Sequence, residues 1–355
     1  MGDRLSLYQP GLSSPVSHRM FEPRQCREPL LEWYQRSRRE LPWRGTSDPW
    51  HILLSEVMLQ QTRVVAVVPY YLRFIERFPT PQALADSPEQ ELLALWSGLG
   101  YYARARNLRR AAQSIVQLGA FPESFEQIKE LAGVGDYTAA AVASIAFGLP
   151  HAVLDGNVVR VLSRLTAECG DARSSSVRAK LKQIADEMLD LDRPGDFNQA
   201  LMELGATICL PRQPQCLLCP LQDHCAGRAQ GTQGELPVKP NKREPIKLAL
   251  ELLLVEKDGR VLMRQRGEHE PQLAGFWELP ESRLIPGARR MARLGEFRHS
   301  ITRNDYSVEV WQAELMRAPK GFRWITLEQL LELPLATTAR KALSLAGRPV
   351  ADGVG

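Results

Sequence analysis

Apolar residues recur at helical spacing in segment after segment of residues 29–226, with Pro, Gly and Ser-Asp pairs between the segments. This period places apolar side chains on one face of a helix, so it predicts a domain that is nearly all helix. The preceding residues 1–28 contain Ser and Pro without such a period, which predicts a flexible lead-in. Residues 227–245 lose the pattern and carry Gly, Gln, Pro and Lys, a composition typical of a linker.

The pattern changes at residue 246, where short β-type runs begin and an Asp-Gly pair marks a turn. The runs that favour strands are 247–256, 260–265 and 306–313, and those with helical spacing are 324–333 and 339–345. The chain is therefore predicted to be a multi-domain protein, with an all-α domain followed by an α+β domain over 246–355.

Composition and charge permit a polyanionic partner without establishing one. The 355 residues are 44% hydrophobic and 24% charged, and the formal net charge is +4. No basic segment followed by an apolar core opens the chain, so we expect a cytoplasmic protein rather than a secreted one. The uncharged run 137–154 is interrupted by Gly148 and Pro150, which favours a buried helix over a membrane span.

An Asp-Pro pair at 48–49 opens a predicted helix in which Glu56 lies among leucine, valine and methionine. Apolar surroundings disfavour a charged carboxylate and raise its pKa above about 4.3, as a general acid requires. The alternative is a surface glutamate on an amphipathic helix. Gln60 shares the face of Glu56, and Gln61 and Thr62 follow with groups that could contact bases.

A glycine-punctuated stretch, residues 131–157, joins two predicted helices through a hairpin. Gly133 and Gly135 permit a tight turn with exposed N–H groups, a geometry that can hold a phosphate. The alanine-rich run 138–147 predicts a buried helix. Asp155 follows, and it is either the N-cap of the next helix or a carboxylate that stabilises positive charge.

Four cysteines lie close together in the pattern C-x6-C-x2-C-x5-C, at Cys209, Cys216, Cys219 and Cys225. Without a secretory signal, four thiols in one short loop favour a metal over disulfides. Zinc and a four-iron four-sulfur cluster both accept four thiolates, so the spacing leaves the metal open. The isolated Cys26 and Cys169 are interpreted as ordinary residues.

Several motifs extend over about residues 41–225: LPWR, DPWHILLSEVMLQQT, WSGLGYYARARNLRRAA, LAGVGDYTAAAVASIAF, LDGNVVRVLSRL, NQALMELGA and the cysteine loop. Together they resemble the helix-hairpin-helix DNA glycosylase superfamily, and within it the adenine DNA glycosylases of the MutY type. The resemblance implies removal of adenine mispaired with 8-oxoguanine, or with guanine, after base flipping. It further implies a monomer that binds duplex DNA in the nucleoid of a bacterial cell, with no membrane.

The resemblance also assigns catalytic roles. It makes Glu56 the general acid that protonates the adenine, and Asp155 the carboxylate that stabilises the sugar oxocarbenium ion. Tyr137 stands where lyase relatives carry a lysine, and a phenol cannot form a Schiff base, which implies a monofunctional enzyme. Tyr137 and Asn157 are implied to support the active site, and the four cysteines to hold one 4Fe-4S cluster.

Residues that contact DNA are implied in the same way. They are Arg44 near the adenine pocket, the stack-intruding Gln61, Thr62 and Tyr101, and Leu99, Gly133, Gly135 and Thr302. For Tyr101 and Tyr102 the alternative is core packing. The nearby arginines, Arg104, Arg106, Arg109 and Arg110, are interpreted as a solvated basic face, with phosphate contact as the alternative.

The residues from 246 resemble the C-terminal domain of the same family, which is similar to Nudix hydrolases, through GFWELPE at 275–281. A working Nudix site needs a glutamate-rich helix for magnesium, and no acidic residue occurs between Ser282 and Gly295. We therefore expect a lesion-reading domain. The Phe-Ser-His loop common in the family is replaced by Ile301, Thr302 and Arg303, where Thr302 can supply the hydroxyl; His299 is a weaker candidate.

Three classes of function compete: a base-excising glycosylase, a Nudix-type nucleotide hydrolase, and a non-catalytic DNA-binding protein with a structural metal. The missing acidic helix argues against the second class. Glu56 together with Asp155 argues against the third, and Tyr137 argues against a lyase. The sequence therefore predicts a monofunctional adenine DNA glycosylase.

Overall fold

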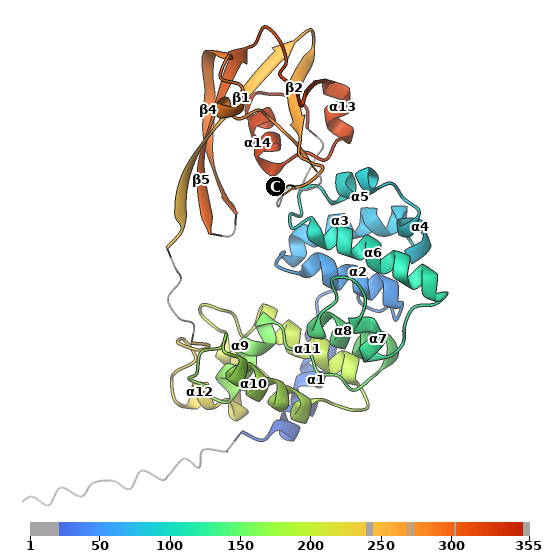
Figure 1. Ribbon diagram of the computed structural model, residues 1–355. Coiled ribbons are helices and arrows are strands. Elements are labelled where there is room, and N and C mark those ends of the chain that lie inside the picture. Colours follow the sequence, from blue (N-terminus) through green and yellow to red (C-terminus); the bar gives the residue numbers. More distant parts are fainter. Residues whose placement is uncertain (1–20, 239–243, 268–269, 271–272, 302, 351–355) are drawn as a thin grey trace, which may run out of the picture. The chain divides into compact units, whose positions relative to one another are not determined.

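The computed structural model describes residues 21–238, 244–267, 270, 273–301 and 303–350 (Figure 1). The chain forms two compact units, and each unit combines two separate stretches of sequence. The first unit comprises Met1–Arg39 and Gly148–Pro240, and the second comprises Glu40–Phe147 and Asn241–Gly355.

The first unit is helical and is built around α9 (Gly156–Leu165), in which every side chain from Val158 to Leu165 is buried. α9 packs against α10 (Ser175–Met188), α11 (Pro194–Thr207) and α12 (Ala226–Ala229). The other elements are the 3₁₀ turns η1 (Pro23–Cys26), η2 (Cys216–Leu218) and η3 (Gln222–His224), and α1 (Arg27–Ser37), which packs on α11.

The helical part of the second unit surrounds α2 (Pro49–Leu59), in which Ile52 to Met58 are all buried. Asp48 caps this helix by accepting hydrogen bonds from two backbone N–H groups, as predicted. The small alanines of α8 (Asp136–Phe147) allow it to pack closely on α2. The remaining helices are α3 (Val64–Arg77), α4 (Pro81–Ala85), α5 (Glu89–Trp96), α6 (Ala103–Leu118) and α7 (Phe125–Lys129).

The second unit also contains a six-stranded sheet in the order β3-β2-β1-β5-β4, with β6 paired to β2. β1 and β5 are parallel, and β4 pairs antiparallel to β5. The strands are β1 (Ile246–Lys257), β2 (Arg260–Gln265), β3 (Trp277–Glu278), β4 (Arg289–Ile301), β5 (Asn304–Glu314) and β6 (Phe322–Thr326). α13 (Leu327–Glu332) and α14 (Thr337–Leu345) pack on the sheet (Figure 1), adding Leu330 and Leu343 to its core.

The predicted order, an all-α part followed by an α+β part, is confirmed. The helix predicted over 324–333 is wrong in its first turn, because β6 extends to Thr326 and Trp324 pairs there with Leu262. Strand pairing thus outweighs the local helical spacing. Within the described ranges, no helix is both long and apolar enough to cross a membrane.

Candidate functional site

The carboxyl group predicted to be buried in α2 accepts a hydrogen bond from α8. Glu56 is 5% exposed, and Tyr137 Oη donates to Glu56 Oε2 over 2.5 Å. This distance is at the short end of the range for O–H···O hydrogen bonds. Beside this pair, Gln60 Nε2 donates to Thr138 Oγ1 over 3.4 Å. The alternative of a surface glutamate is therefore wrong.

The glycine hairpin between α7 and α8 packs tightly on α6. Gly133 has a φ of 78°, and a Cβ at this position would lie 2.6 Å from the Cβ of Asn107. Any other residue would therefore have to displace that side chain. The space around Gly135 is open. Both glycines are exposed, so a ligand in solution can reach this stretch of backbone.

Asp155 caps α9 and also holds Asn157. Its Oδ1 accepts from the Val158 N–H over 2.7 Å, and its Oδ2 accepts from Asn157 Nδ2 over 2.9 Å. Burial raises the pKa of Asp155, whereas these hydrogen bonds and the charge of Arg160 act to lower it. Each carboxylate oxygen keeps a second lone pair. The two alternatives for Asp155, a helix cap and a charge-stabilising carboxylate, are therefore compatible.

Arg160 connects Asn157 to the cysteine loop. Its Nη2 donates to Asn157 Oδ1 over 2.8 Å, and its Nε donates to the Cys209 carbonyl over 2.8 Å. Its Nη2 also donates to the Gly205 carbonyl over 2.7 Å. The guanidinium of Arg160 therefore connects the side-chain amide of Asn157 with the backbone of Cys209, a predicted metal ligand.

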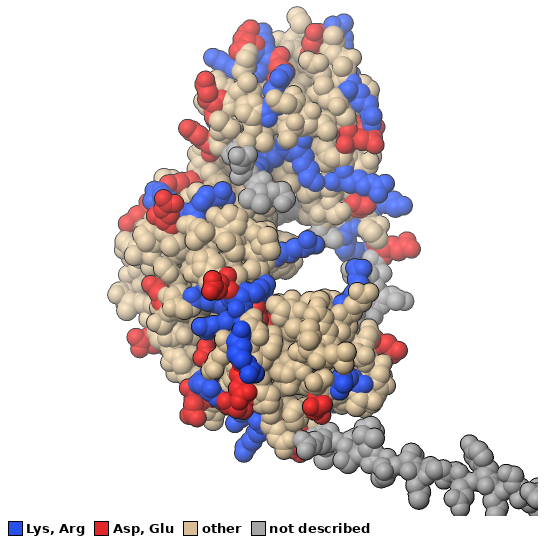
Figure 2. Space-filling view, turned by 180° about the vertical axis from the view of Figure 1, so that it is seen from behind, with Lys and Arg blue, Asp and Glu red and all other residues tan. Residues whose placement is uncertain are grey.

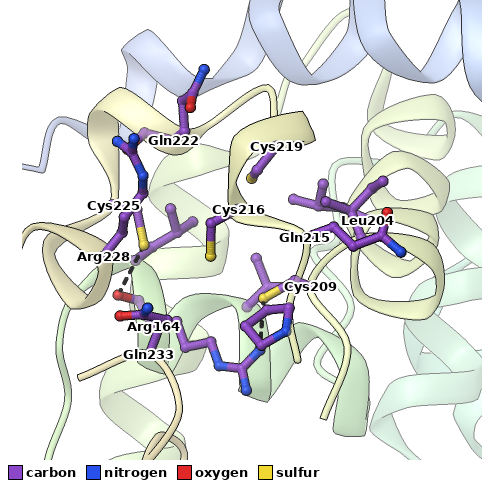
Figure 3. A pocket seen from close by; sticks show the side chains of 14 residues that line it. Arg164, Leu204, Cys209, Gln215, Cys216, Cys219, Gln222, Cys225, Arg228 and Gln233 are labelled. Atoms are coloured by element: carbon purple, nitrogen blue, oxygen red, sulfur yellow. Dashed lines mark hydrogen bonds between the residues drawn. The ribbon is translucent and has the colours of Figure 1, made fainter. Parts of the chain in front are cut away.

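The four predicted metal-ligating cysteines line one pocket, and Figure 3 shows their sulfurs around a common space: Cys209, Cys216, Cys219 and Cys225. Arg164 Nη1 donates to Cys209 Sγ over 3.3 Å and to the Leu210 carbonyl over 2.7 Å. Burial, together with the neighbouring thiols, raises the pKa of Cys219 to about 12. The free thiol of Cys219 would therefore stay protonated, and its ionised form needs a positive partner.

These donors fit a thiolate-bound cluster chemically. Four sulfurs face one space, and the buried guanidinium of Arg164 supplies positive charge beside one of them. Thiolate ligands with hydrogen bonds to sulfur are the usual environment of iron–sulfur centres. In the part of the chain that the structure describes, no three His, Cys, Asp or Glu side chains form a site for a single metal ion.

The side chains predicted to enter the base stack lie at two loop tips of the second unit. Gln61 is exposed, and Tyr101 is 50% exposed whereas Tyr102 is 5% exposed. Core packing therefore describes Tyr102 but not Tyr101. Of the other predicted DNA contacts, Leu99 is buried and Arg44 and Thr62 are partly buried.

The interpretation of the α6 arginines as a solvated basic face is wrong for Arg104, which is 8% exposed. Arg106 pairs with Glu89 over 2.7 Å, and Arg109 donates to the Ser87 carbonyl over 2.9 Å. Figure 2 shows acidic side chains interspersed among the basic ones over the face in view. Charge alone therefore does not mark a DNA-binding surface.

The lesion-reading residues predicted in the second domain follow one another in the sequence between the end of β4 and the start of β5. Ile301 ends β4 opposite Asn304, and Thr302 lies outside the described residues. The segment in which a Nudix hydrolase would need its acidic helix forms the 3₁₀ turn η4 (Ser282–Leu284) and the start of β4 instead.

A cavity of about 640 Å³ lies beside this sheet, with Glu251, Glu278 and Arg266 in its lining. Glu278 pairs with Arg264 over 3.3 Å and with Arg266 over 2.9 Å, and Glu251 pairs with Arg290 over 2.6 Å. Glu251 and Glu278 are therefore both paired with arginines.

Comparison with known proteins gives these features a context. Residues 54–187 match the HhH-GPD superfamily of base excision DNA repair proteins, and residues 251–345 match the NUDIX domain. A structure of a thermostable thymine-DNA glycosylase is similar to this chain with a TM-score of 0.54 and 30% identity, covering 59% of this chain and 97% of the other. The fold and the site thus define a base excision repair DNA glycosylase followed by a NUDIX domain.

Two curated relatives narrow this class. The adenine DNA glycosylase of Mus musculus is 34% identical over 398 residues, which cover 90% of this chain and 77% of the mouse protein. That of Buchnera aphidicola subsp. Baizongia pistaciae is 37% identical over 253 residues, which cover 70% of each chain. The chain therefore belongs to the adenine DNA glycosylase family, and the resemblance found in its sequence is confirmed.

Proposed function

We propose that this chain removes adenine mispaired with 8-oxoguanine or guanine, by hydrolysing the N-glycosidic bond after the adenine has left the duplex. The observation that carries the proposal is the buried carboxyl of Glu56, which accepts a hydrogen bond from Tyr137 over 2.5 Å. A buried carboxyl held in one orientation can deliver a proton to a leaving base.

Glu56 acts as the general acid in this proposal. It protonates the adenine, which departs with the bonding electron pair and leaves an oxocarbenium ion on the sugar. The hydroxyl of Tyr137 orients the carboxyl and cannot attack the sugar as an amine would. Water therefore completes the reaction, and the strand stays uncut.

Asp155 stabilises the oxocarbenium ion by its negative charge. Its hydrogen bonds from the Val158 N–H and from Asn157 favour the ionised form and fix the carboxylate. Asn157 is fixed in turn by Arg160. This chain of contacts supports a carboxylate that needs no reorganisation when positive charge develops.

We assign binding of the duplex to the two loop tips that carry Gln61 and Tyr101 and to the glycine hairpin between α7 and α8. Gln61, Thr62 and Tyr101 enter the stack beside the mispair, and Gly133 and Gly135 hold the strand backbone. Arg44 lies near the adenine pocket, and Leu99 is a further DNA-binding residue. The exposure of Gln61 and Tyr101 supports the first role. The NUDIX domain reads 8-oxoguanine through the β4–β5 turn, and Thr302 is the candidate there.

The cysteine pocket would hold one 4Fe-4S cluster through Cys209, Cys216, Cys219 and Cys225. The cluster would tie the loop together as a structural cofactor, without taking part in bond cleavage. Iron and sulfide analysis, together with an absorption band in the visible blue, would distinguish the cluster from colourless zinc. The enzyme would act as a monomer in the nucleoid.

The central test is an excision assay on three duplexes. These hold adenine opposite 8-oxoguanine, adenine opposite guanine, or an oxidised pyrimidine, and abasic sites are cleaved with alkali. We expect cleavage of the first two only after alkali treatment. Cleavage of the pyrimidine duplex alone, or strand cleavage without alkali, would contradict the proposal.

A matched pair of variants assigns the general acid. Glu56→Gln should abolish excision, because the amide cannot protonate the base. Glu203 is a comparably buried carboxyl, 1% exposed and paired with Arg39 over 2.7 Å. Glu203→Gln therefore controls for the loss of any buried carboxylate, and it should reduce excision only as far as it reduces the folded fraction. Equal losses in both folded variants would argue against Glu56 as the acid.

A further inference from the structure

The guanidinium of Arg104 joins the two loop tips that carry Gln61 and Tyr101. Arg104 lies in the first turn of α6 and is 8% exposed. Its Nη1 donates to the carbonyls of Val57 (3.0 Å), Met58 (2.9 Å) and Gln60 (2.5 Å). Its Nη2 donates to Thr62 Oγ1 (3.2 Å) and to the carbonyls of Leu99 (3.2 Å) and Gly100 (3.3 Å). Four of these acceptors lie in one tip or the other, and the remaining two, on Val57 and Met58, lie in the helix that leads into the first tip.

The first group of contacts caps the helix that carries Glu56. The carbonyls at a helix C-terminus lack intrahelical partners and carry partial negative charge. Val57 and Met58 lie in the last turn of α2, and Gln60 is its C-cap. Burial lowers the pKa of Arg104 to about 10, so the side chain keeps its charge at neutral pH. A charged donor therefore satisfies this helix end from another element.

The contacts also hold two unusual backbone conformations. Gln61 has a φ of 57° and Tyr101 a φ of 49°, in the left-handed region that residues other than glycine seldom adopt. The carbonyl just before each of them, on Gln60 and on Gly100, accepts from Arg104. One guanidinium thus fixes the peptide plane that precedes each strained residue.

Two aromatic rings complete the enclosure of the guanidinium. Arg104 Cζ lies 5.6 Å from the ring centroid of Trp96 and 5.4 Å from that of Tyr101. Both distances are within the range of cation–π attraction. Tyr101 is thus held both through its backbone and through the ring that is exposed to solvent.

We propose that Arg104 is a positioning residue that pre-forms both tips before DNA arrives, so that Gln61 and Tyr101 meet the duplex in one fixed conformation. Without it the strained backbone would relax, and binding would have to order the tips again. The proposal rests on the proposed function for the claim that the tips contact DNA. The claim that Arg104 fixes them is independent of the substrate.

Hydrogen exchange of backbone amides in the DNA-free protein tests directly whether Arg104 fixes the conformation of the two tips. In Arg104→Lys and Arg104→Met we expect the amides of Thr62 and Leu99, each hydrogen-bonded within its tip, to exchange at least about tenfold faster. The amides of α9 and of the sheet should keep their rates. Arg109→Met is the matched control, because Arg109 is also on α6 and donates to a backbone carbonyl, that of Ser87. It should leave both tips unchanged.

A uniform increase across the whole protein, or unchanged exchange in the tips of a folded variant, would overturn the proposal. If Arg104→Met does not fold and Arg104→Lys exchanges as the unchanged protein does, Arg104 is a residue for core stability only and the proposal is rejected.

Binding supplies a second readout that a purely structural role would not move. Arg104→Lys should weaken binding of a mispair duplex with a non-cleavable adenine analogue by about tenfold, as expected when one stacking contact is disordered. In a Gln61→Ala, Tyr101→Ala background the same change should weaken binding much less, because the side chains that both tips present to the duplex are already gone. An effect of Arg104→Lys as large in this background as in the unchanged protein would contradict the proposal. If the unchanged protein excises no adenine, the proposed function fails while the exchange result still decides the role of Arg104.

Discussion

Replacing Asp155 by Asn separates the two roles that this side chain combines. Asparagine caps helices about as well as aspartate, whereas alanine costs about 0.5–2 kcal/mol. The new amide would face Asn157 Nδ2, which now donates to Oδ2 over 2.9 Å, so one hydrogen bond of about 1 kcal/mol is lost. The change also removes a carboxylate whose pKa burial raises, and each unit of such a rise destabilises the ionised fold by about 1.4 kcal/mol.

These two effects oppose each other, so Asp155→Asn should melt within about 3 °C of the unchanged protein. Excision should respond very differently. Removing one preorganised electrostatic contact to a transition state typically costs about 2.7–4 kcal/mol, which corresponds to a rate reduced about 100- to 1000-fold. Single-turnover excision of adenine opposite 8-oxoguanine, read by alkaline cleavage of the abasic site, measures this loss.

The stability difference should also depend on pH. A carboxyl with a raised pKa in the folded state keeps its proton at pH values where the unfolded chain has already lost it. Its stabilising contribution is present at low pH and is lost as the pH rises through the folded pKa. Asp155→Asn should therefore gain stability relative to the unchanged protein between acid and neutral pH. Melting temperatures across that window measure the gain.

Asp155→Ala is the control for the cap, since it loses both the charge and the hydrogen bond to Val158. It should melt lower than Asp155→Asn and excise no faster. Near-normal excision by a folded Asp155→Asn would refute the charge-stabilising role and leave Asp155 as a helix cap alone.

Three further outcomes are expected. Tyr137→Phe should slow excision about tenfold, because it removes the hydrogen bond that orients Glu56, worth about 1.5 kcal/mol; a rate within about twofold of normal would contradict this orientation. Cys219→Ser should lose iron and visible absorption, whereas Cys169→Ser, an exposed cysteine outside the pocket, should keep both; equal loss in both variants would exclude a selective role for Cys219. Gly133→Ala should weaken duplex binding more than Gly135→Ala, since a Cβ at Gly133 meets Asn107 and a Cβ at Gly135 meets nothing within 4 Å; filter binding would show equal affinities if the hairpin geometry were irrelevant.

The sequence predicts an element well where local physics and packing agree. The Asp-Pro start and apolar run of α2 and the alanine-rich α8 carry their own signals, and both helices form where expected. β4 is different, because its side chains are mostly exposed or half-buried and give no apolar run. Its position is fixed by pairing with β5. Such non-local pairing leaves little trace in the strand itself.

The same contrast explains the site. The burial of Glu56 was predictable because apolar residues flank it on both sides in the sequence, and the structure gives it 5% exposure. The burial of Arg104 was not, since its Nη1 acceptors are backbone carbonyls 44 to 47 positions earlier. Every residue has a backbone carbonyl, so the sequence does not show which carbonyls accept a hydrogen bond. An arginine that binds buried carbonyls therefore cannot be distinguished in the sequence from a solvated arginine. The arginines of α9 are different, because Arg160 and Arg164 lie in the apolar run VVRVLSRL and a charged residue in such a run needs a buried partner.

That run is also where the first unit joins its two functional features. Arg160 and Arg164 are four residues apart, so they lie on one face of α9. Arg160 holds Asn157 and the Cys209 carbonyl, while Arg164 donates to the Cys209 sulfur. The helix that Asp155 caps is therefore fixed to the cysteine loop by the side chains of Arg160 and Arg164. A shift of Cys209 would move Arg160, and with it the Asn157 amide that donates to Asp155. The loop that would hold the cofactor is therefore coupled to the carboxylate that would stabilise the oxocarbenium ion. This coupling passes through side chains that do not react.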